Sequence, residues 1–414
     1  MLFRSFGRLN QTVWRWGNAS GSTLAGAPAS ELTRKPEPIP SLTGIAEKIT
    51  SIANGSEHSA VAVDGKLMTF GNNKFQQLGR VTGSNSADPI PGPAEADSPV
   101  VSVSCGSWHS VSMHNDGSVK SFGWGGSFLS GAGALGHGSK TSISVPTTID
   151  FFKQIPERVV QISCGNQHTL FLTENGTVYA TGHGAYGILG TGDSSDELFP
   201  VEIEALKTTL RENEKVVKIQ CGGNFSALVT NAGNLYVWGR NDSGQLGLGE
   251  ESQGDMHSAE RYPRQIPFFE TERTHIKDVV CGENHMVALA SNGAIYYWGD
   301  RTWLEPHVVS LPEANGGLKG IVKIAAGSKF SYALSESGIV YSWGNKNSGC
   351  LVIDDVTKNI VSPTPIPPSV FNNEKVIDIA AGRQRCLAVT SDEELIVTSP
   401  AEAAQVKERL GRSV

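Results

Sequence analysis

Apolar and polar residues alternate in short segments that recur along the whole chain. Segments such as 159–164 (VVQISC) and 216–221 (VVKIQC) alternate with a period of two, which is typical of a β-strand with two different faces. Each is followed by a glycine, a second apolar stretch, a polar turn and a third apolar stretch. The pattern therefore predicts a β-protein built from one repeated unit.

Pairs of residues with almost fixed spacing mark the copies of this unit. A leading glycine is followed 17 residues later, or 16 in the first copy, by a residue that closes an aromatic-rich strand. The pairs are Gly55 and Gly71, Gly106 and Gly123, Gly165 and Gly182, Gly222 and Gly239, Gly282 and Gly299, Gly327 and Gly344, and Gly382 and Ser399. The spacing predicts seven units, the last of them degenerate.

Turn and edge signals complete the unit. Asp116-Gly117, Asn175-Gly176 and Asn292-Gly293 predict tight hairpins between the second and third strands, because these dipeptides accept positive backbone angles. A fourth segment carries proline, as at 145–149, and is predicted to be an edge strand because proline donates no ladder hydrogen bond. Four antiparallel strands in each of seven units predict an all-β fold, the seven-bladed β-propeller.

The ends of the chain are expected to close the ring. The seventh unit lacks a proline-bearing fourth strand, whereas the N-terminal region offers strand-like segments at 12–17 and 38–42. We predict that N-terminal strands complete the closing blade, and whether 394–398 or 12–17 is its third strand stays open. The propeller is assigned to residues 12–399 and a short C-terminal helical tail to 400–414.

Composition narrows the classes of protein. The 414 residues carry a net charge of -7, which gives no general attraction to polyanions. No apolar run approaches the roughly 18 residues of a membrane span. Four of the six cysteines directly precede leading glycines, at intervals that fit no zinc motif, and are predicted to be small buried strand residues.

Residues 1–11 form a possible mitochondrial presequence. Arg4 and Arg8 lie among serine and apolar residues, and the first acid is Glu31. A short leader without a targeting role is the alternative. The expected location is the mitochondrion, with cytoplasm or nucleus as alternatives.

The units at 159–193 and 216–250 resemble the repeats of the regulator of chromosome condensation family, and the resemblance covers about residues 12–399. The N-terminal Trp-Gly strand and the possible presequence make the chain closest in style to the mitochondrial relatives. The resemblance implies a non-enzymatic propeller that binds a protein partner in mitochondria. It would act as a guanine-nucleotide exchange factor-like regulator of a small or dynamin-like GTPase, or in ribosome or RNA assembly.

Two alternatives remain. One is a nuclear or cytosolic exchange factor for the GTPase Ran; the acidic positions that this resemblance implies align with Ser20, Ser130 and Gln167, none of which is acidic. The other is a pure interaction scaffold. Neither implies a cofactor or a metal.

Candidate chemistry is sparse. His58, His109, His168 and His285 follow leading glycines in different units, which favours a shared structural hydrogen bond over a metal site or catalysis. The glycine-rich stretch 123–133 lacks the Gly-Lys-Ser/Thr ending of a phosphate loop and is interpreted as an expanded blade loop. We predict no enzyme active site.

Partner contacts are expected on loops at the ends of the repeats, because loops on a rigid scaffold commonly carry binding residues. The candidate residues are Trp124, Phe128, Leu129, Arg240, Asp242, Asn345 and Lys346. The segments 80–99 and 250–275 are further expected to be long loops.

Overall fold

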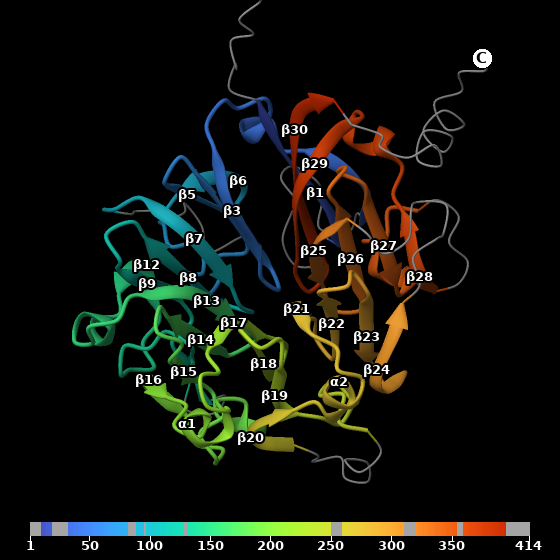
Figure 1. Ribbon diagram of the computed structural model, residues 1–414. Coiled ribbons are helices and arrows are strands. Elements are labelled where there is room, and N and C mark those ends of the chain that lie inside the picture. Colours follow the sequence, from blue (N-terminus) through green and yellow to red (C-terminus); the bar gives the residue numbers. More distant parts are fainter. Residues whose placement is uncertain are drawn as a thin grey trace, which may run out of the picture.

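The fold is a ring of β-sheets. The computed structural model describes residues 10–18, 32–81, 88–94, 97–127, 131–249, 259–309, 320–353 and 359–394. Within them the strands form seven four-stranded antiparallel sheets and one two-stranded hairpin. The sheets stand as blades around a central channel of about 400 Å³ (Figure 1). The prediction of an all-β, seven-bladed propeller is confirmed.

In every blade the first strand lines the channel and the fourth lies at the outer edge. Blade 1 consists of β3 (Ile49–Asn54), β4 (His58–Val63), β5 (Lys66–Gly71) and β6 (Asp88–Pro93), and blade 2 of β7 (Val100–Cys105), β8 (His109–His114), β9 (Val119–Gly123) and β12 (Ile143–Thr148). Blade 3 consists of β13 (Val159–Cys164), β14 (His168–Thr173), β15 (Val178–Gly182) and β16 (Glu197–Glu202), blade 4 of β17 (Val216–Cys221), β18 (Phe225–Thr230), β19 (Leu235–Arg240) and β20 (Ala259–Gln265), and blade 5 of β21 (Ile276–Cys281), β22 (His285–Ala290), β23 (Ile295–Gly299) and β24 (Trp303–Val309). Blade 6 consists of β25 (Ile321–Ala326), β26 (Phe330–Ser335), β27 (Val340–Gly344) and β28 (Ile360–Pro365), and blade 7 of β29 (Glu374–Ala381), β30 (Arg385–Glu394), β1 (Gln11–Asn18) and β2 (Leu32–Pro38).

Short elements lie in the connections. They are the hairpin β10 (Gly126–Ser127) and β11 (Gly131–Ala132), the helices α1 (Leu206–Thr209) and α2 (Pro267–Thr271), and the 3-10 turns η1 (Pro40–Leu42), η2 (Asp150–Lys153), η3 (Ala185–Gly187), η6 (Lys346–Ser348) and η7 (Pro368–Phe371).

Burial explains the strand patterns. Every residue of β14 and β18 is buried, since second strands are covered by the neighbouring blades on both faces. First strands alternate because one face of each meets the channel. The expected hairpins are present, but only Gly117, Gly176 and Gly293 adopt positive φ, of +86°, +95° and +90°, and the preceding Asp or Asn does not.

The closing blade joins the two ends of the chain, in the order β2-β1-β30-β29. Trp14 pairs with Ala388 and Trp16 with Cys386, so β1 is the third strand, which settles the open choice. The fourth strand is β2 rather than the expected 38–42, because Pro40 starts the 3-10 turn η1. The tail at 400–414 and all but the last two residues of the leader at 1–11 lie outside the described residues.

Two segments expected to be long loops are partly regular. The segment 80–99 contains β6, and 250–275 contains β20 and α2. Both strands carry proline at the outer edge of a sheet, where a missing N–H leaves no ladder bond unmade. The prediction of loops was wrong for these strands because their proline and polar residues are also typical of loops.

The leading glycines form a closed ring around the channel. An added Cβ would lie 2.5 Å from the carbonyl oxygen of Gly165 at Gly106, and 2.4 Å from that of Gly55 at Gly382. Such distances exclude any side chain. The first strands of neighbouring blades can therefore approach closely only because these positions are glycine.

The histidines link successive blades. Nε2 of His58 lies 2.7 Å from Ser110 Oγ, that of His109 3.1 Å from Thr169 Oγ1, that of His168 3.0 Å from Ser226 Oγ, and that of His285 2.9 Å from Ser331 Oγ. Blades 4 and 6 have Phe225 and Phe330 at this position, and the facing residues are then Met286 and Cys386. The structural hydrogen bond expected from the sequence is present in each histidine-bearing blade.

The hydroxyl groups determine which tautomer the histidines adopt. Ser226 Oγ donates to the carbonyl oxygen of Ile188 at 2.9 Å, so His168 must donate through Nε2. Burial lowers the pKa of His58 to about 3, of His109 to about 4 and of His168 to about 3. These imidazoles are therefore neutral in the folded protein.

Stability is expected to fall in acid, because the unfolded chain takes up protons at these histidines below about pH 6.5 and the folded chain does not. Each histidine contributes a slope of up to about 1.4 kcal/mol per pH unit between about pH 6 and 4. The double variant His168→Phe/Ser226→Met copies the Phe225 and Met286 pair. Its free energy of unfolding should depend less steeply on pH, by the contribution of one histidine. Urea unfolding at several pH values measures this, and an unchanged slope would contradict it.

Candidate functional site

Strand direction places two sets of loops on one face of the propeller. The loops after the first strands and after the third strands lie at the same end of each antiparallel blade; we call this side the loop face and the other the turn face. Five predicted contacts lie here: Arg240 at the end of the third strand β19, and Trp124, Asp242, Asn345 and Lys346 in the loops after third strands. Phe128 and Leu129 belong to the same set of loops but lie outside the described residues.

A chain of polar groups crosses the loop-face mouth of the channel. Ser56 Oγ and Ser107 Oγ are 2.9 Å apart, and Ser107 donates to Asn166 Oδ1 at 2.9 Å. Asn166 Nδ2 then reaches past blade 4 to Glu283 Oε1 at 3.0 Å. Gly223 leaves room for this contact, since a Cβ there would lie 3.2 Å from the Glu283 carboxylate. The mouth therefore holds fixed hydrogen-bonding groups.

Aromatic side chains gather between blades 1 and 2. The ring of Trp108 lies 5.4 Å from that of Phe75 and 5.3 Å, edge-on, from that of Trp124. Lys74 Nζ lies 5.4 Å from the centre of the Phe75 ring. Trp124 is 8% exposed, whereas Trp108 and Phe75 are half-buried and offer more surface to a partner.

Arg240 and Asp242, two of the predicted residues, form an ion pair. Arg240 Nη2 lies 2.6 Å from Asp242 Oδ2, and the two side chains are 31% and 11% exposed. The guanidinium also lies over the Tyr186 ring at 5.0 Å. Arg301 of the next blade approaches the same carboxylate at 3.9 Å. Asp242 thus lies between two arginines.

The turn that carries Arg301 is strained. Asp300 and Arg301 have φ of +50° and +58°, and nearby Tyr186 has +61°. Left-handed backbone costs a non-glycine residue about 1–3 kcal/mol and persists where the surroundings hold it. Tyr297 donates to Asp300 at 3.1 Å and the Arg301 N–H donates to the Ser243 carbonyl at 2.9 Å. Such strain commonly marks binding sites.

Blades 2 and 3 and blade 6 add further polar groups to the loop face. His183 Nδ1 lies 2.7 Å from Asp196 Oδ1, which also accepts from the Gly184 N–H, and Lys140 approaches the other carboxylate oxygen at 3.7 Å. Asn345 caps the turn η6 by accepting from the Asn347 N–H at 2.8 Å, which leaves Lys346 exposed.

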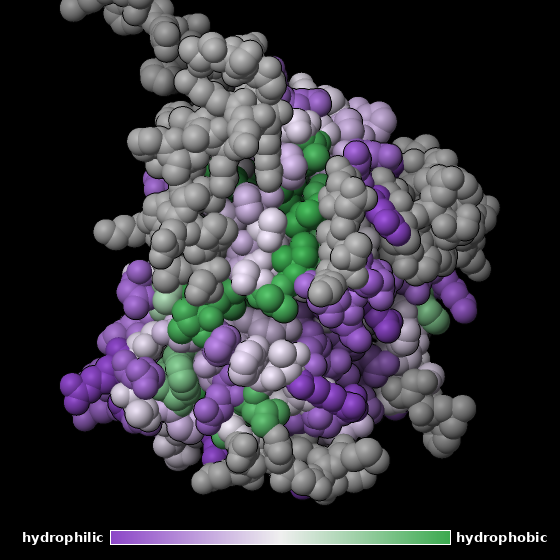
Figure 2. All heavy atoms as spheres, turned by 90° about the vertical axis from the view of Figure 1, so that its right-hand side faces the viewer, coloured by the Kyte–Doolittle hydropathy of each residue, from purple (hydrophilic) through white to green (hydrophobic). Residues whose placement is uncertain are grey.

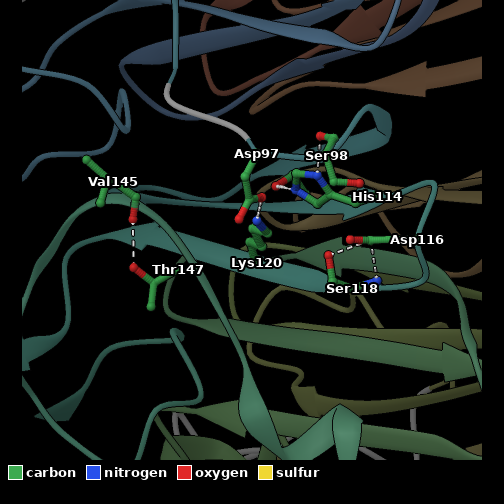
Figure 3. A network of polar contacts seen from close by, with 9 residues as sticks. Asp97, Ser98, His114, Asp116, Ser118, Lys120, Val145 and Thr147 are labelled. Atoms are coloured by element: carbon green, nitrogen blue, oxygen red, sulfur yellow. Dashed lines mark hydrogen bonds and ion pairs between the residues drawn. The ribbon is translucent and has the colours of Figure 1, made fainter.

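The turn face carries a separate polar network in blade 2 (Figure 3). The Lys120 ammonium, with a side chain only 5% exposed, pairs with the Asp97 carboxylate. Nδ1 of His114 donates to the Ser98 carbonyl at 2.8 Å, and burial lowers the pKa of His114. Lys120 occupies the position of Tyr179 and Tyr236 in other blades, so this network replaces a packing contact.

Most exposed apolar side chains of the described residues lie outside the loops of the loop face; Val81, after the third strand β5, is an exception. The others occur on outer edge strands, as Trp303 and Val308 of β24 and Val361 of β28, and near the starts of first strands, as Val160 and Val217. Seen from the side of β24 and β28, hydrophobic residues lie among hydrophilic ones (Figure 2). The loop face is thus the side with ordered, directional polar groups.

Metal ligation and thiol chemistry can be assessed for the described residues. Within the described residues no group of three or more His, Cys, Asp or Glu is placed to hold a metal ion. No metal-bound or activated thiol is indicated at Cys164, because burial raises its pKa to about 12 and leaves the thiol protonated. No helix in the described part of the chain is long and apolar enough to cross a membrane.

Sequence reasoning missed several groups on the loop face. Tyr186, Arg301 and Asp300 were not selected, because their left-handed backbone and their contacts across blades leave no trace in local sequence. Gln167, one of the positions aligned with acidic residues, does lie on this face and accepts from the His183 N–H at 2.9 Å. Ser20 and Ser130 lie outside the described residues.

The chain is similar to one family of proteins along most of its length. Residues 129–406 match the RCC1-like domain, and residues 64–113 and 100–128 match the regulator of chromosome condensation (RCC1) repeat. The E3 ubiquitin-protein ligase HERC2 of Homo sapiens is 30% identical over 329 residues, which are 77% of this chain and 6% of HERC2. The chain thus spans a small part of that relative.

One further relative and one solved structure match most of their own length. The ultraviolet-B receptor UVR8 of Arabidopsis thaliana is 29% identical over 368 residues, covering 84% of this chain and 76% of the receptor. The crystal structure of Prp20p from Saccharomyces cerevisiae superposes with a TM-score of 0.79 at 22% identity, covering 98% of this chain and 96% of that one. At this identity the likeness shows the propeller fold.

Removal of the Asp242 carboxylate should loosen this part of the face. Asp242→Ala leaves the part-buried Arg240 without its acceptor and should lower the free energy of unfolding by about 1–2 kcal/mol. Lys346→Ala, at an exposed position, is the control and should change it by less than about 0.5 kcal/mol. Equal effects of the two substitutions in chemical unfolding would show that the ion pair does not stabilise the loop.

Proposed function

The chain belongs to the regulator of chromosome condensation (RCC1) repeat family, and from that premise we propose that it is a non-enzymatic propeller that binds a protein partner through its loop face. The observation that carries the proposal is the convergence of fixed polar and aromatic groups there, including the Arg240 and Asp242 pair and the half-buried Trp108. Pre-ordered groups lose little entropy on binding.

A GTPase is the proposed partner, and nucleotide exchange the proposed consequence. Prp20p, which shares the fold, has binding properties to Gsp1p and histones, and the family resemblance implies exchange-factor activity. A propeller that binds the nucleotide-free GTPase more tightly than the loaded form would shift the equilibrium towards release without any covalent step.

Partner binding is tested with one variant on the loop face and one at the outer edge. Trp108→Ala should weaken binding of the affinity-purified partner at least about tenfold, as expected when an aromatic at an interface centre is lost. Val308→Ala, at a 45% exposed position near the turn-face end of the edge strand β24, is the control and should leave binding unchanged. If only the control variant loses the partner, the binding surface is the outer edge and the proposal fails.

Exchange is tested separately. Micromolar protein should accelerate release of fluorescent GDP from the partner GTPase, and Ran serves as the comparison that separates an organellar regulator from a Ran exchange factor. A partner that binds without any acceleration would contradict exchange and favour the scaffold.

We also propose import into mitochondria, directed by the basic, acid-free segment before β1. A tagged full chain should reach mitochondria, and removal of residues 1–9, which leaves β1 whole, should abolish this. Cytosolic fluorescence from the intact chain would contradict the proposal.

A further inference from the structure

Exposed cations line the loop face over consecutive blades. We define the cationic arc as Arg301 of blade 5, Lys329 and Lys346 of blade 6, Arg383 of blade 7 and Lys74 of blade 1, all of which are exposed. The Arg301 side chain is 75% exposed. Within the described residues, Lys329 and Arg383 have no carboxylate at ion-pair distance, so their charges are available to a partner.

Four acids of the same face, in blades 1, 4 and 5, are turned inward, whereas Asp193 of blade 3 is exposed. Glu57, Asp242, Glu283 and Asp300 are half-buried, and each accepts a hydrogen bond from a neighbour. The donors are Asn72 at 2.5 Å, Arg240 at 2.6 Å, Asn166 at 3.0 Å and Tyr297 at 3.1 Å. In blades 5, 6, 7 and 1 the described part of the loop face therefore presents positive charge outward although the chain has a net charge of -7.

Arg301 is held in place by the strained turn. Its N–H donates to Ser243 and the Thr302 N–H donates to Gly299, both at 2.9 Å, so the turn is anchored to its own blade and to blade 4. Asp242 attracts the guanidinium weakly at 3.9 Å, which leaves most of its five N–H groups for another acceptor. The turn therefore fixes the backbone from which the Arg301 guanidinium extends into solvent.

We propose that the cationic arc docks an acidic surface of the protein partner, with Arg301 as its anchor; this rests on the proposed function and specifies the chemistry of the partner. Electrostatic complementarity of this kind steers association and fixes the orientation of the complex.

An acidic protein surface fits the arc better than a nucleic acid does. The five cations are spread over four blades, and the carboxylates of Glu283 and Asp300 in blade 5 belong to the same face. Discrete carboxylates of a protein can pair with single cations, whereas a phosphate backbone needs a continuous positive track. The overall negative charge opposes a polyanion further.

The test uses two fluorescent probes, a deca-glutamate peptide and an oligouridine of the same length, measured by anisotropy at low and physiological salt. The loop-face triple variant Arg301→Glu/Lys329→Glu/Arg383→Glu is compared with the turn-face triple Lys48→Glu/Lys215→Glu/Arg273→Glu. Both change the net charge equally, and Arg273 matches Arg301 in being exposed with a positive φ, of +49°. Circular dichroism and unfolding confirm that both variants fold.

The peptide should bind the parent chain in a salt-sensitive way. The loop-face triple should weaken binding at least about tenfold and the turn-face triple less than about twofold. No binding of the peptide, or equal losses in both triples, would overturn the proposal. Tighter binding of oligouridine that the loop-face triple removes would also overturn it, in favour of a nucleic acid.

The outcome for the purified partner separates this inference from the proposed function. If Trp108→Ala releases the partner and the loop-face triple retains it, the proposal of an acidic docking surface is wrong, and the proposal of binding through the loop face stands. If both variants retain it, the loop face is not the binding surface and both proposals fail.

Discussion

The contact between successive leading glycines is the constraint on which the rest of the structure depends. At each of these positions except Gly222, a carbonyl oxygen of the next blade occupies the space that a side chain would need. This contact brings the first strands together around the channel and lets the last blade meet the first at Gly382 and Gly55. A ring of blades can close only when every blade keeps the same approach.

The second link between blades follows from the first. Once the glycines bring the strands together, the side chain three residues further on lies over the leading glycine in blades 1 to 6 and reaches the next blade. A histidine there meets a hydroxyl group, and Phe225 or Phe330 meets Met286 or Cys386. A polar side chain thus faces a polar one in the next blade, and an apolar side chain faces an apolar one. The buried imidazoles therefore have hydrogen-bonding partners. The loops of the loop face are positioned by this rigid inner ring.

Much of the fold could be predicted from the chain because the same local rules recur in every blade. The spacing from Gly165 to Gly182, the alternation in 159–164 and the edge prolines all reflect short-range constraints. The site is different. The proximity of Arg301 to Asp242 joins two blades, and the reach of Asn166 to Glu283 crosses a third. Such contacts depend on the closed ring, so the sequence predicted Arg240 and Asp242 as candidates without their neighbours.

The closed inner ring thus supports the loop face, which we propose as the surface that binds a partner. Hydrogen–deuterium exchange of the full chain, alone and bound to its purified partner, tests this most directly. Binding should slow exchange in the loop-face segments 72–80, 240–249 and 299–303 and leave the turns at 64–66, 115–118 and 174–177 unchanged. Slower exchange in those turns, with unchanged loops after the first and third strands, would contradict the account.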